Sequence, residues 1–161
     1  MIIDCHGHYT TAPKALENWR NQQIAGLKDA ASKPRVSDLK ISDDELRESI
    51  EGNQLRLMKE RGSDLTIFSP RASFMAHHIG DFETSSTWAA ICNELCFRVS
   101  LLFPNDSRRA AMLPQSPGVD PRSCIPELER CVREYGFVAI NLNPDPSGGH
   151  WTSPPLSDRH W

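Results

Sequence analysis

The amino-acid sequence predicts an α/β protein built on a parallel sheet. Short apolar runs alternate with helix-like patterns, four such strand–helix units can be traced, and polar residues follow the ends of the apolar runs. Four units are half of a (β/α)8 TIM barrel, which takes about 250 residues, so the 161 residues are expected to supply one wall of such a barrel. A complete small open sheet is the alternative architecture.

The first half of the chain is predicted to hold one strand and one clear helix. The strand covers residues 2–6, and residues 10–40 are a polar stretch with scattered prolines that is interpreted as a long loop. The helix begins at Ser42, which forms a capping box with Glu45, and it ends at Gly62. Its buried face is expected to carry Leu46, Ile50 and Leu57.

The second half continues the alternation. Three further strands are predicted, at residues 64–70, 109–114 and 137–144. The helix between the first two begins near Ser85 or Ser86 and ends at Pro104. The next helix begins at Asp120, an N-cap followed by proline, and ends at Gly136. Its apolar face is expected to carry Ile125, Leu128, Val132 and Tyr135.

Composition excludes several classes of protein. The formal charge of −3 comes from interspersed acids and bases without a basic block, so no nucleic-acid partner is expected. No apolar run approaches the roughly 18 to 20 residues that cross a bilayer, and no secretory leader pattern is present, which predicts a cytoplasmic protein without a membrane partner. The cysteines are odd in number and form no CxxC pair, so they are expected to be reduced and mostly buried: Cys5, Cys92, Cys96, Cys124 and Cys131.

Two histidines stand one residue apart at the end of the first apolar run, "MIIDCHGHYT". Residues two apart in a strand face the same side, so His6 and His8 are expected to project together. Imidazole nitrogens bind Zn²⁺ or a similar ion at about 2.0 to 2.1 Å, and Asp4 on the same face would be placed to orient a histidine. The alternative is a pair of ordinary surface or core histidines.

Polar residues also follow the later strands, where parallel sheets gather their ligands. In "SPRASF", Arg71 offers a planar guanidinium for a carboxylate and Ser73 adds a further donor, whereas the alternative is a loop arginine paired with an acid. Asn141 and Asn143 share a face of the fourth strand and would either bind a polar substrate or cap local turns.

Two other pairs of residues favour an ordinary structural role. His77 and His78 would serve as acid–base groups or partial ligands, but solvated loop histidines are the favoured interpretation. Cys92 and Cys96 stand four apart on an apolar helix face, so core packing is favoured over metal binding.

Several sequence stretches carry a resemblance to a known family. "DCHGH" fits the D-x-H-x-H opening of the amidohydrolase superfamily, metal-dependent (β/α)8 barrels whose first strand ends in two metal-binding histidines. With "SPRASFMAHHIGDF", "STWAAICNEL", "AAMLPQSPGVDP" and "FVAINLNPDPSGGHWTSPPLSDR", the whole chain resembles the 4-oxalomesaconate hydratase family. The resemblance implies a lyase that converts 4-oxalomesaconate to 4-carboxy-4-hydroxy-2-oxoadipate in bacterial degradation of gallate and protocatechuate.

The resemblance also implies roles for particular residues. His6 and His8 would bind a divalent metal, expected to be Zn²⁺, and Arg71 would contact a carboxylate of a small tricarboxylate substrate. Ser73 and Asn143 are the other candidates for substrate binding, while the catalytic acid and base are not identified. Further ligands come from later strands in the superfamily. The chain is therefore expected to be a single domain, residues 1–161, truncated after the N-terminal half of an enzyme that is a homo-oligomer at full length.

Two alternatives to a hydratase remain open. A metal-dependent decarboxylase or hydrolase of the same superfamily would use the same first-strand histidines. A catalytically inactive fragment that serves as an interaction module would expose apolar sheet edges and tend to self-associate.

Overall fold

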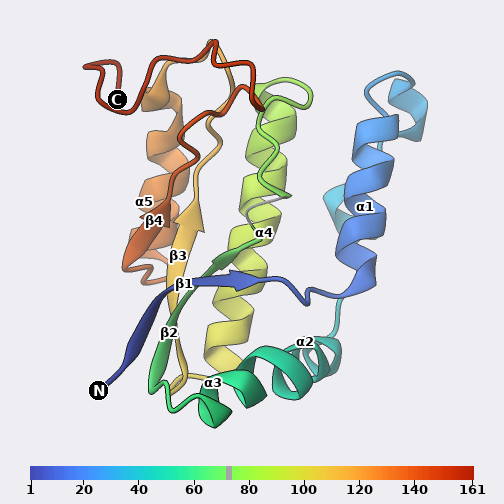
Figure 1. The fold of residues 1–161 in the computed structure, drawn as a ribbon. Helices are drawn as coiled ribbons and strands as arrows, with labels where there is room; N and C mark the ends of the chain where they lie inside the picture. The colour runs from blue at the N-terminus through green and yellow to red at the C-terminus, as the bar shows by residue number, and fades with distance from the viewer. Residues whose placement is uncertain (72–73) are drawn as a thin grey trace.

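The computed structural model describes residues 1–71 and 74–161, and its strands form a parallel sheet in the order β1-β2-β3-β4 (Figure 1). The strands are β1 (Ile3–Tyr9), β2 (Leu65–Pro70), β3 (Ser107–Met112) and β4 (Ala139–Asn141). Each strand lies beside the next one in the chain, and helices occupy every connection, as in consecutive βα units of a barrel wall. The predicted α/β half-barrel is therefore confirmed.

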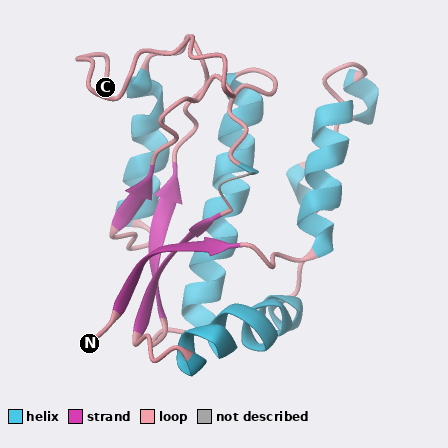
Figure 2. Ribbon diagram, viewed as in Figure 1, coloured by secondary structure: helices cyan, strands magenta, loops and turns pink. Residues whose placement is uncertain are grey.

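The helices lie mainly on one side of this sheet. Figure 2 shows α4 (Phe82–Leu102) and α5 (Ile125–Arg133) running along the strands, while α2 (Asp43–Ile50) and α3 (Arg56–Glu60) cross one end of the sheet and α1 (Lys14–Ala25) stands further out. Short helical turns complete the connections: η1 (Ala30–Ser32), η2 (Val36–Asp38), η3 (Glu51–Leu55) and η5 (Pro121–Cys124). Within the described residues, no helix is long and apolar enough to cross a membrane.

The predicted capping box starts α2. Ser42 Oγ accepts a hydrogen bond from the Glu45 main-chain nitrogen at 3.2 Å, and the Ser42 nitrogen donates to Glu45 Oε2 at 2.8 Å. Two of the four N–H groups that a helix start leaves unpaired are thereby satisfied or shielded. Gly62, with a φ of +70°, follows α3 in the left-handed region, which only glycine adopts without strain.

The continuous helix expected here contains a π-helical turn, η3, between α2 and α3. Leu46 and Ile50 before this turn are buried as predicted, but Leu57 after it is 37% exposed. A π-turn adds a residue to the helical repeat, so the side chains that follow point in a different direction from the one that the sequence periodicity predicts. The expectation that Leu57 shares the buried face was therefore wrong.

The interpretation of residues 10–40 as a loop was also wrong, because they contain α1. Its N-cap, Pro13, makes no side-chain capping bond. Of its four buried side chains, Leu16 and Trp19 are apolar, but Arg20 and Gln23 are polar. Neither a capping signal nor an apolar stripe was therefore visible. Arg20 is accommodated by hydrogen bonding to Gln23 Oε1 at 2.5 Å and by stacking 4.9 Å from the Trp88 ring centroid.

Two other helices differ from prediction in detail. α4 begins at Phe82, earlier than expected, because Asp81 Oδ1 accepts from the Thr84 nitrogen at 2.8 Å and acts as the N-cap. In α5 the predicted apolar face is wrong in part, since Ile125 and Val132 are 47% and 50% exposed.

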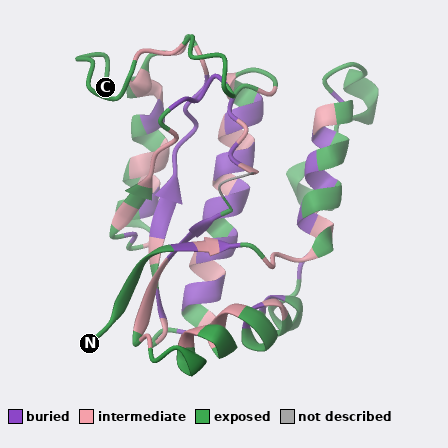
Figure 3. Ribbon diagram, viewed as in Figure 1, coloured by how far each residue is buried: buried purple, intermediate pink, exposed green. Residues whose placement is uncertain are grey.

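The core lies between the sheet and α4 (Figure 3). Trp88 is fully buried there and packs beside Trp19, with the two ring planes almost parallel and their centroids 6.3 Å apart. The cysteines follow the prediction: Cys92, Cys96, Cys124 and Cys131 are buried free thiols, and Cys5 is exposed. Burial raises the pKa of the Cys124 thiol to about 11 and that of Cys131 to about 12.

Candidate functional site

A β-bulge between Asp4 and Gly7 of β1 contains His6, the first histidine of the pair. Asp4 pairs with Thr66 and Gly7 with Phe68, so β1 advances by three residues while β2 advances by two. Figure 1 shows β1 bending across the sheet. Asp4 Oδ1 accepts a hydrogen bond from the main-chain nitrogen of His6 at 3.0 Å. The carboxylate thus binds the backbone of the bulge rather than a histidine ring, which corrects the expected orienting role of Asp4.

His6 and His8 lie side by side, as their spacing predicts. Their Nε2 atoms are 3.1 Å apart, and the ring centroids are separated by 4.6 Å with an interplanar angle of 82°. Two nitrogens bound to one zinc ion at about 2.0 to 2.1 Å with tetrahedral angles lie about 3.3 Å apart. The observed separation therefore fits both nitrogens to one ion, without a change in the course of β1.

The other nitrogen of His8 is held by the neighbouring strand. His8 Nδ1 lies 3.0 Å from the Pro70 carbonyl oxygen and 2.8 Å from Ser69 Oγ. A carbonyl oxygen only accepts, so the contact with Pro70 requires the proton on Nδ1 and leaves a lone pair on Nε2. This is the form in which a histidine binds a metal through Nε2. The main-chain oxygen of His8 accepts from Gln54 Nε2, which η3 carries.

No complete metal centre is assembled by this part of the chain. Among residues 1–71 and 74–161, no group of three or more His, Cys, Asp or Glu side chains is arranged to hold a metal ion. A structural zinc site takes four protein ligands and a catalytic site takes three. The pair His6 and His8 alone therefore offers fewer side chains than either kind of zinc site takes.

The three residues predicted to bind substrate, Arg71, Ser73 and Asn143, are not in equivalent positions. Arg71 directly follows β2 and stacks with its guanidinium carbon 4.8 Å from the centroid of the Phe74 ring, while Ser73 lies outside the described residues. Asn143 Oδ1 accepts from the Asp145 nitrogen at 3.0 Å, so this side chain caps a local turn, the alternative that the sequence left open. Gln115 fixes the main chain of Asn143 through hydrogen bonds of 2.7 and 3.1 Å.

Ser69 and Asn141 also belong to the histidine cluster. Ser69 is 4% exposed and stands opposite His8 in the sheet register, and Asn141 Nδ2 approaches its Oγ at 3.4 Å. Asn141 was expected either to bind a polar substrate or to cap a turn, but Ser69 was missed. The signal available was its place near the end of an apolar strand, which becomes informative only once the pairing of β1 with β2 is known.

His77 is not a solvated loop histidine, so that interpretation was wrong. Its side chain is 1% exposed, and Nδ1 lies 3.0 Å from Ser85 Oγ. Burial lowers the pKa of His77 to about 4, with smaller contributions from the charges of Arg20 and His78. His77 is thus a neutral histidine in the core, whereas His78 is exposed.

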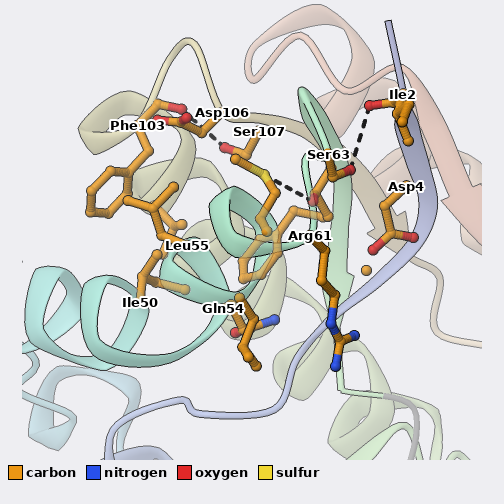
Figure 4. Close-up of a pocket in the computed structure, with 16 residues that line it drawn as sticks. Ile2, Asp4, Ile50, Gln54, Leu55, Arg61, Ser63, Phe103, Asp106 and Ser107 are labelled. Carbon is orange, nitrogen blue, oxygen red and sulfur yellow. Dashed lines mark hydrogen bonds between the residues drawn. The ribbon is translucent and has the colours of Figure 1, made fainter.

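A separate hollow of about 400 Å³ lies between the sheet and the α2–α3 segment (Figure 4). Figure 4 shows Ile50, Leu55 and Phe103 on one side of it and Ile2 and Asp4 on the other. Its lining is mostly apolar. His6 and His8 lie outside this hollow, so it is distinct from the histidine cluster.

Comparisons with known proteins agree with this geometry. The amidohydrolase family matches residues 3–161. The 2-keto-4-carboxy-3-hexenedioate hydratase of Sphingobium sp. (strain NBRC 103272 / SYK-6) is 60% identical over 161 residues, which is 100% of this chain and 47% of that protein. The crystal structure of 4-oxalomesaconate hydratase from Rhodopseudomonas palustris is 75% identical with a TM-score of 0.93, and the match covers 100% of this chain and 47% of that one.

A more distant solved structure shares the fold. The dihydroxybenzoic acid decarboxylase of Polaromonas sp. JS666, with bound manganese and the inhibitor 2-nitroresorcinol, is 29% identical with a TM-score of 0.58 over 88% of this chain and 38% of that one. This chain spans about half the length of the two hydratases that it matches. Because the family match covers nearly every residue, the chain belongs to the amidohydrolase family.

Proposed function

We propose that this chain is the N-terminal part of a metal-dependent hydratase that adds water to 4-oxalomesaconate, giving 4-carboxy-4-hydroxy-2-oxoadipate in bacterial degradation of gallate and protocatechuate. The observation that carries the proposal is the 75% identity and TM-score of 0.93 to the Rhodopseudomonas palustris 4-oxalomesaconate hydratase over all of this chain. The 60% identical relative is also named as a hydratase.

We infer that His6 and His8 supply two ligands of a divalent metal, and zinc is the predicted ion. The Nε2 separation of 3.1 Å and the Nδ1 contact of His8 with the Pro70 carbonyl support this assignment. When bound, such an ion supplies a Lewis acid for a carbonyl or carboxylate oxygen, or an activated water. The role of this chain is to orient the two histidine rings. Both rings are carried by β1, and β2 holds His8 at Nδ1.

Arg71 and Ser73 are proposed to bind the carboxylates of the substrate, and Asn143, whose Oδ1 caps the local turn, would add its amide Nδ2 as a further donor. Arg71 follows Pro70, whose carbonyl supports His8, so the guanidinium is attached directly beside the metal-binding strand end. A guanidinium is suited to a carboxylate because it donates two parallel hydrogen bonds. The phenyl ring of Phe74 supports the guanidinium from one face and leaves its edge for a ligand.

The test is a chimera in which residues 1–161 replace the matching 47% of the Rhodopseudomonas palustris enzyme. With Zn²⁺ or Mn²⁺ it should consume 4-oxalomesaconate, followed by absorbance, and the same chimera with His6→Ala and His8→Ala should not. His78→Ala, at an exposed histidine, is the matched control. A chimera that folds and binds metal but shows no hydration would overturn the proposed reaction.

The isolated 161-residue chain should bind zinc weakly and show no measurable hydration. Two histidines fall short of the three or four protein ligands that hold zinc well, and no described side chain completes the set. Turnover by the isolated chain at the rate of the chimera would mean that every catalytic group lies within residues 1–161. His77, His78 and His150 would then be the next residues to test.

Arg71→Ala in the chimera should lower kcat/KM by about 10- to 150-fold, the loss of a charge-assisted contact of about 1.5–3 kcal/mol. Arg122→Ala, at an exposed arginine paired with Asp120 elsewhere, should leave the kinetics unchanged. Unchanged kinetics of the Arg71 variant would leave Arg71 as an ordinary loop residue.

A decarboxylase is the second candidate, favoured by the likeness to the manganese-containing Polaromonas enzyme. Incubating the chimera with a dihydroxybenzoic acid and measuring released CO₂ distinguishes the two reactions, and we expect none. A role as an inactive interaction module predicts instead that neither assay responds to the histidine substitutions. Homo-oligomerisation of a longer protein and a cytoplasmic location stay predictions.

A further inference from the structure

Ser69 joins three strands at the histidine cluster. It is a polar residue near the end of an apolar strand, and it is buried. Its Oγ lies 2.8 Å from His8 Nδ1 and 2.9 Å from the Gly7 carbonyl oxygen, both on β1, and 3.4 Å from Asn141 Nδ2 on β4. β4 is not a direct neighbour of β2, so the Asn141 side chain extends past β3 to approach Ser69.

The direction of these hydrogen bonds follows from the groups involved. Ser69 has a single hydroxyl proton, and the Gly7 carbonyl oxygen can only accept it. The serine oxygen is then left to accept, and the Asn141 amide nitrogen and His8 Nδ1 are the groups that can donate to it. The Pro70 carbonyl imposes the same proton position on His8. Every contact therefore agrees on one tautomer, with a lone pair on His8 Nε2 facing His6.

The same contacts fix the orientation of the ring. His8 alternates along β1 with Tyr9, which packs beside Phe68, so its side chain points to the opposite face of the sheet, and it is only partly buried. Its main chain is held by β2 pairing and by Gln54. Rotation of the ring about the side-chain bonds is opposed at Nδ1, where Ser69 and Pro70 provide the two acceptors.

We propose that Ser69 is a positioning residue for His8: its hydroxyl, supported by Asn141, holds the ring in the orientation and tautomer that present Nε2 beside the Nε2 of His6. The functional consequence of this role rests on the proposed metal-binding function. The predicted consequence is that Ser69 contributes to metal affinity without touching the metal, because outer partners of metal-binding histidines typically change affinity by about 10- to 100-fold.

The first test needs no metal. Long-range ¹H–¹⁵N spectra of the metal-free 161-residue protein, recorded at a pH where imidazoles are neutral, report which ring nitrogen of His8 carries the proton. Nδ1 is expected in the wild-type protein. In Ser69→Ala only the Pro70 carbonyl still favours this form, so the population with the proton on Nε2 should rise. A wild-type His8 protonated on Nε2 would overturn the inference.

The second test titrates the same proteins with Co²⁺ and follows its visible absorption. Ser69→Ala should weaken binding by about tenfold, and Ser69→Thr, which keeps the hydroxyl, should restore it. Asn141→Ala should have a smaller effect, since its contact is longer. Ser107→Ala is the matched control, because Ser107 is a buried serine at the start of β3, at the other end of the sheet, and its hydroxyl donates to the Phe103 carbonyl after α4. Its Co²⁺ affinity should equal that of the wild-type protein.

The outcomes separate this inference from the proposed function. If Co²⁺ binds the wild-type protein and Ser69→Ala changes neither its affinity nor the His8 tautomer, the positioning role is wrong and the metal site stands. If Co²⁺ binds neither this protein nor the chimera but the tautomer shifts in Ser69→Ala, the positioning role stands and the metal site is wrong. Loss of affinity in Ser69→Thr and Ser107→Ala as well would show general damage to the sheet and would also contradict the positioning role.

Discussion

The two faces of the sheet put neighbouring residues to different uses. Phe68 and Tyr9 face the helices, are each 3% exposed and lie 5.1 Å apart between ring centroids. Ser69 and His8 are the adjacent residues on the same two strands. They face the opposite side of the sheet, the open face, and form a hydrogen bond of 2.8 Å. Strand alternation thus assigns packing to one face and polar chemistry to the other. Substitutions should separate in the same way, with large losses of folding stability confined to the helix-facing side.

The largest expected effect is on the helix side. Trp88→Ala should lower the free energy of unfolding by about 3–5 kcal/mol, because it empties a fully buried site and removes a hydrogen bond to the Phe74 carbonyl. Urea unfolding followed by circular dichroism measures the loss. Trp151→Ala is the control, since Trp151 is 74% exposed and should change stability by about 0.5 kcal/mol or less. Equal effects of the two substitutions would break the comparison.

The buried His77, which contacts Ser85 of α4, should make folding stability depend on pH. The pKa of His77 is about 4 in the folded protein, compared with 6.5 for an ordinary histidine. Between these values the unfolded chain binds a proton that the folded chain excludes, so stability falls as the pH falls. The expected loss from pH 7 to pH 5 is about 2 kcal/mol.

The measurement is the free energy of unfolding in urea at both pH values for wild-type, His77→Gln and His78→Gln proteins. His77→Gln should lose this part of the pH dependence, and the exposed neighbour His78 should not matter to it. Parallel pH profiles for all three proteins would show that His77 is protonated in the folded protein at pH 5.

An intermediate effect is expected where the helix layer meets solvent. Ser42→Ala should cost about 1 kcal/mol, because it removes the side-chain acceptor for the Glu45 nitrogen at the start of α2. Ser42→Asp, which restores an acceptor, should recover most of the stability in the same urea experiment. Equal losses in the alanine and aspartate variants would contradict the capping role.

The smallest effect is expected on the open face. His6 is exposed, and the bulge around it is held through its main chain, so His6→Ala should change the free energy of unfolding by about 0.5 kcal/mol or less. The metal-free protein is the sample to unfold. A loss comparable to that of Trp88→Ala would show that the open face also stabilises the fold, and the separation of the two faces would fail.

Much of the fold was predictable because its signals are local. The Ser42–Glu45 capping box, the four apolar runs and the alternation of strands with helices were all visible in the sequence and are confirmed. α1 was not predictable, because its buried Arg20 and Gln23 look like solvent-facing residues until their partners are known. Likewise, the π-turn leaves no local pattern, so the direction of Leu57 could not be inferred.

The candidate site was also predictable only where its geometry is local. The spacing of His6 and His8 was enough to predict adjacent rings, since it depends only on strand geometry. The partners of those rings depend on register: Ser69 faces His8 only because β1 pairs with β2 as it does, and the bulge turns Asp4 away from the rings. Burial of His77 equally depends on long-range packing against α4, which a loop sequence does not reveal.

The uneven burial of the cysteines makes this site open to chemical labelling. Cys5 is exposed one residue before His6, whereas Cys92, Cys96, Cys124 and Cys131 are buried with raised pKa values that keep their thiols protonated. A maleimide dye should therefore modify the folded wild-type protein at one position. Its fluorescence would report on the histidine cluster without any engineered cysteine, and quenching by Co²⁺ would give a direct readout of metal arrival.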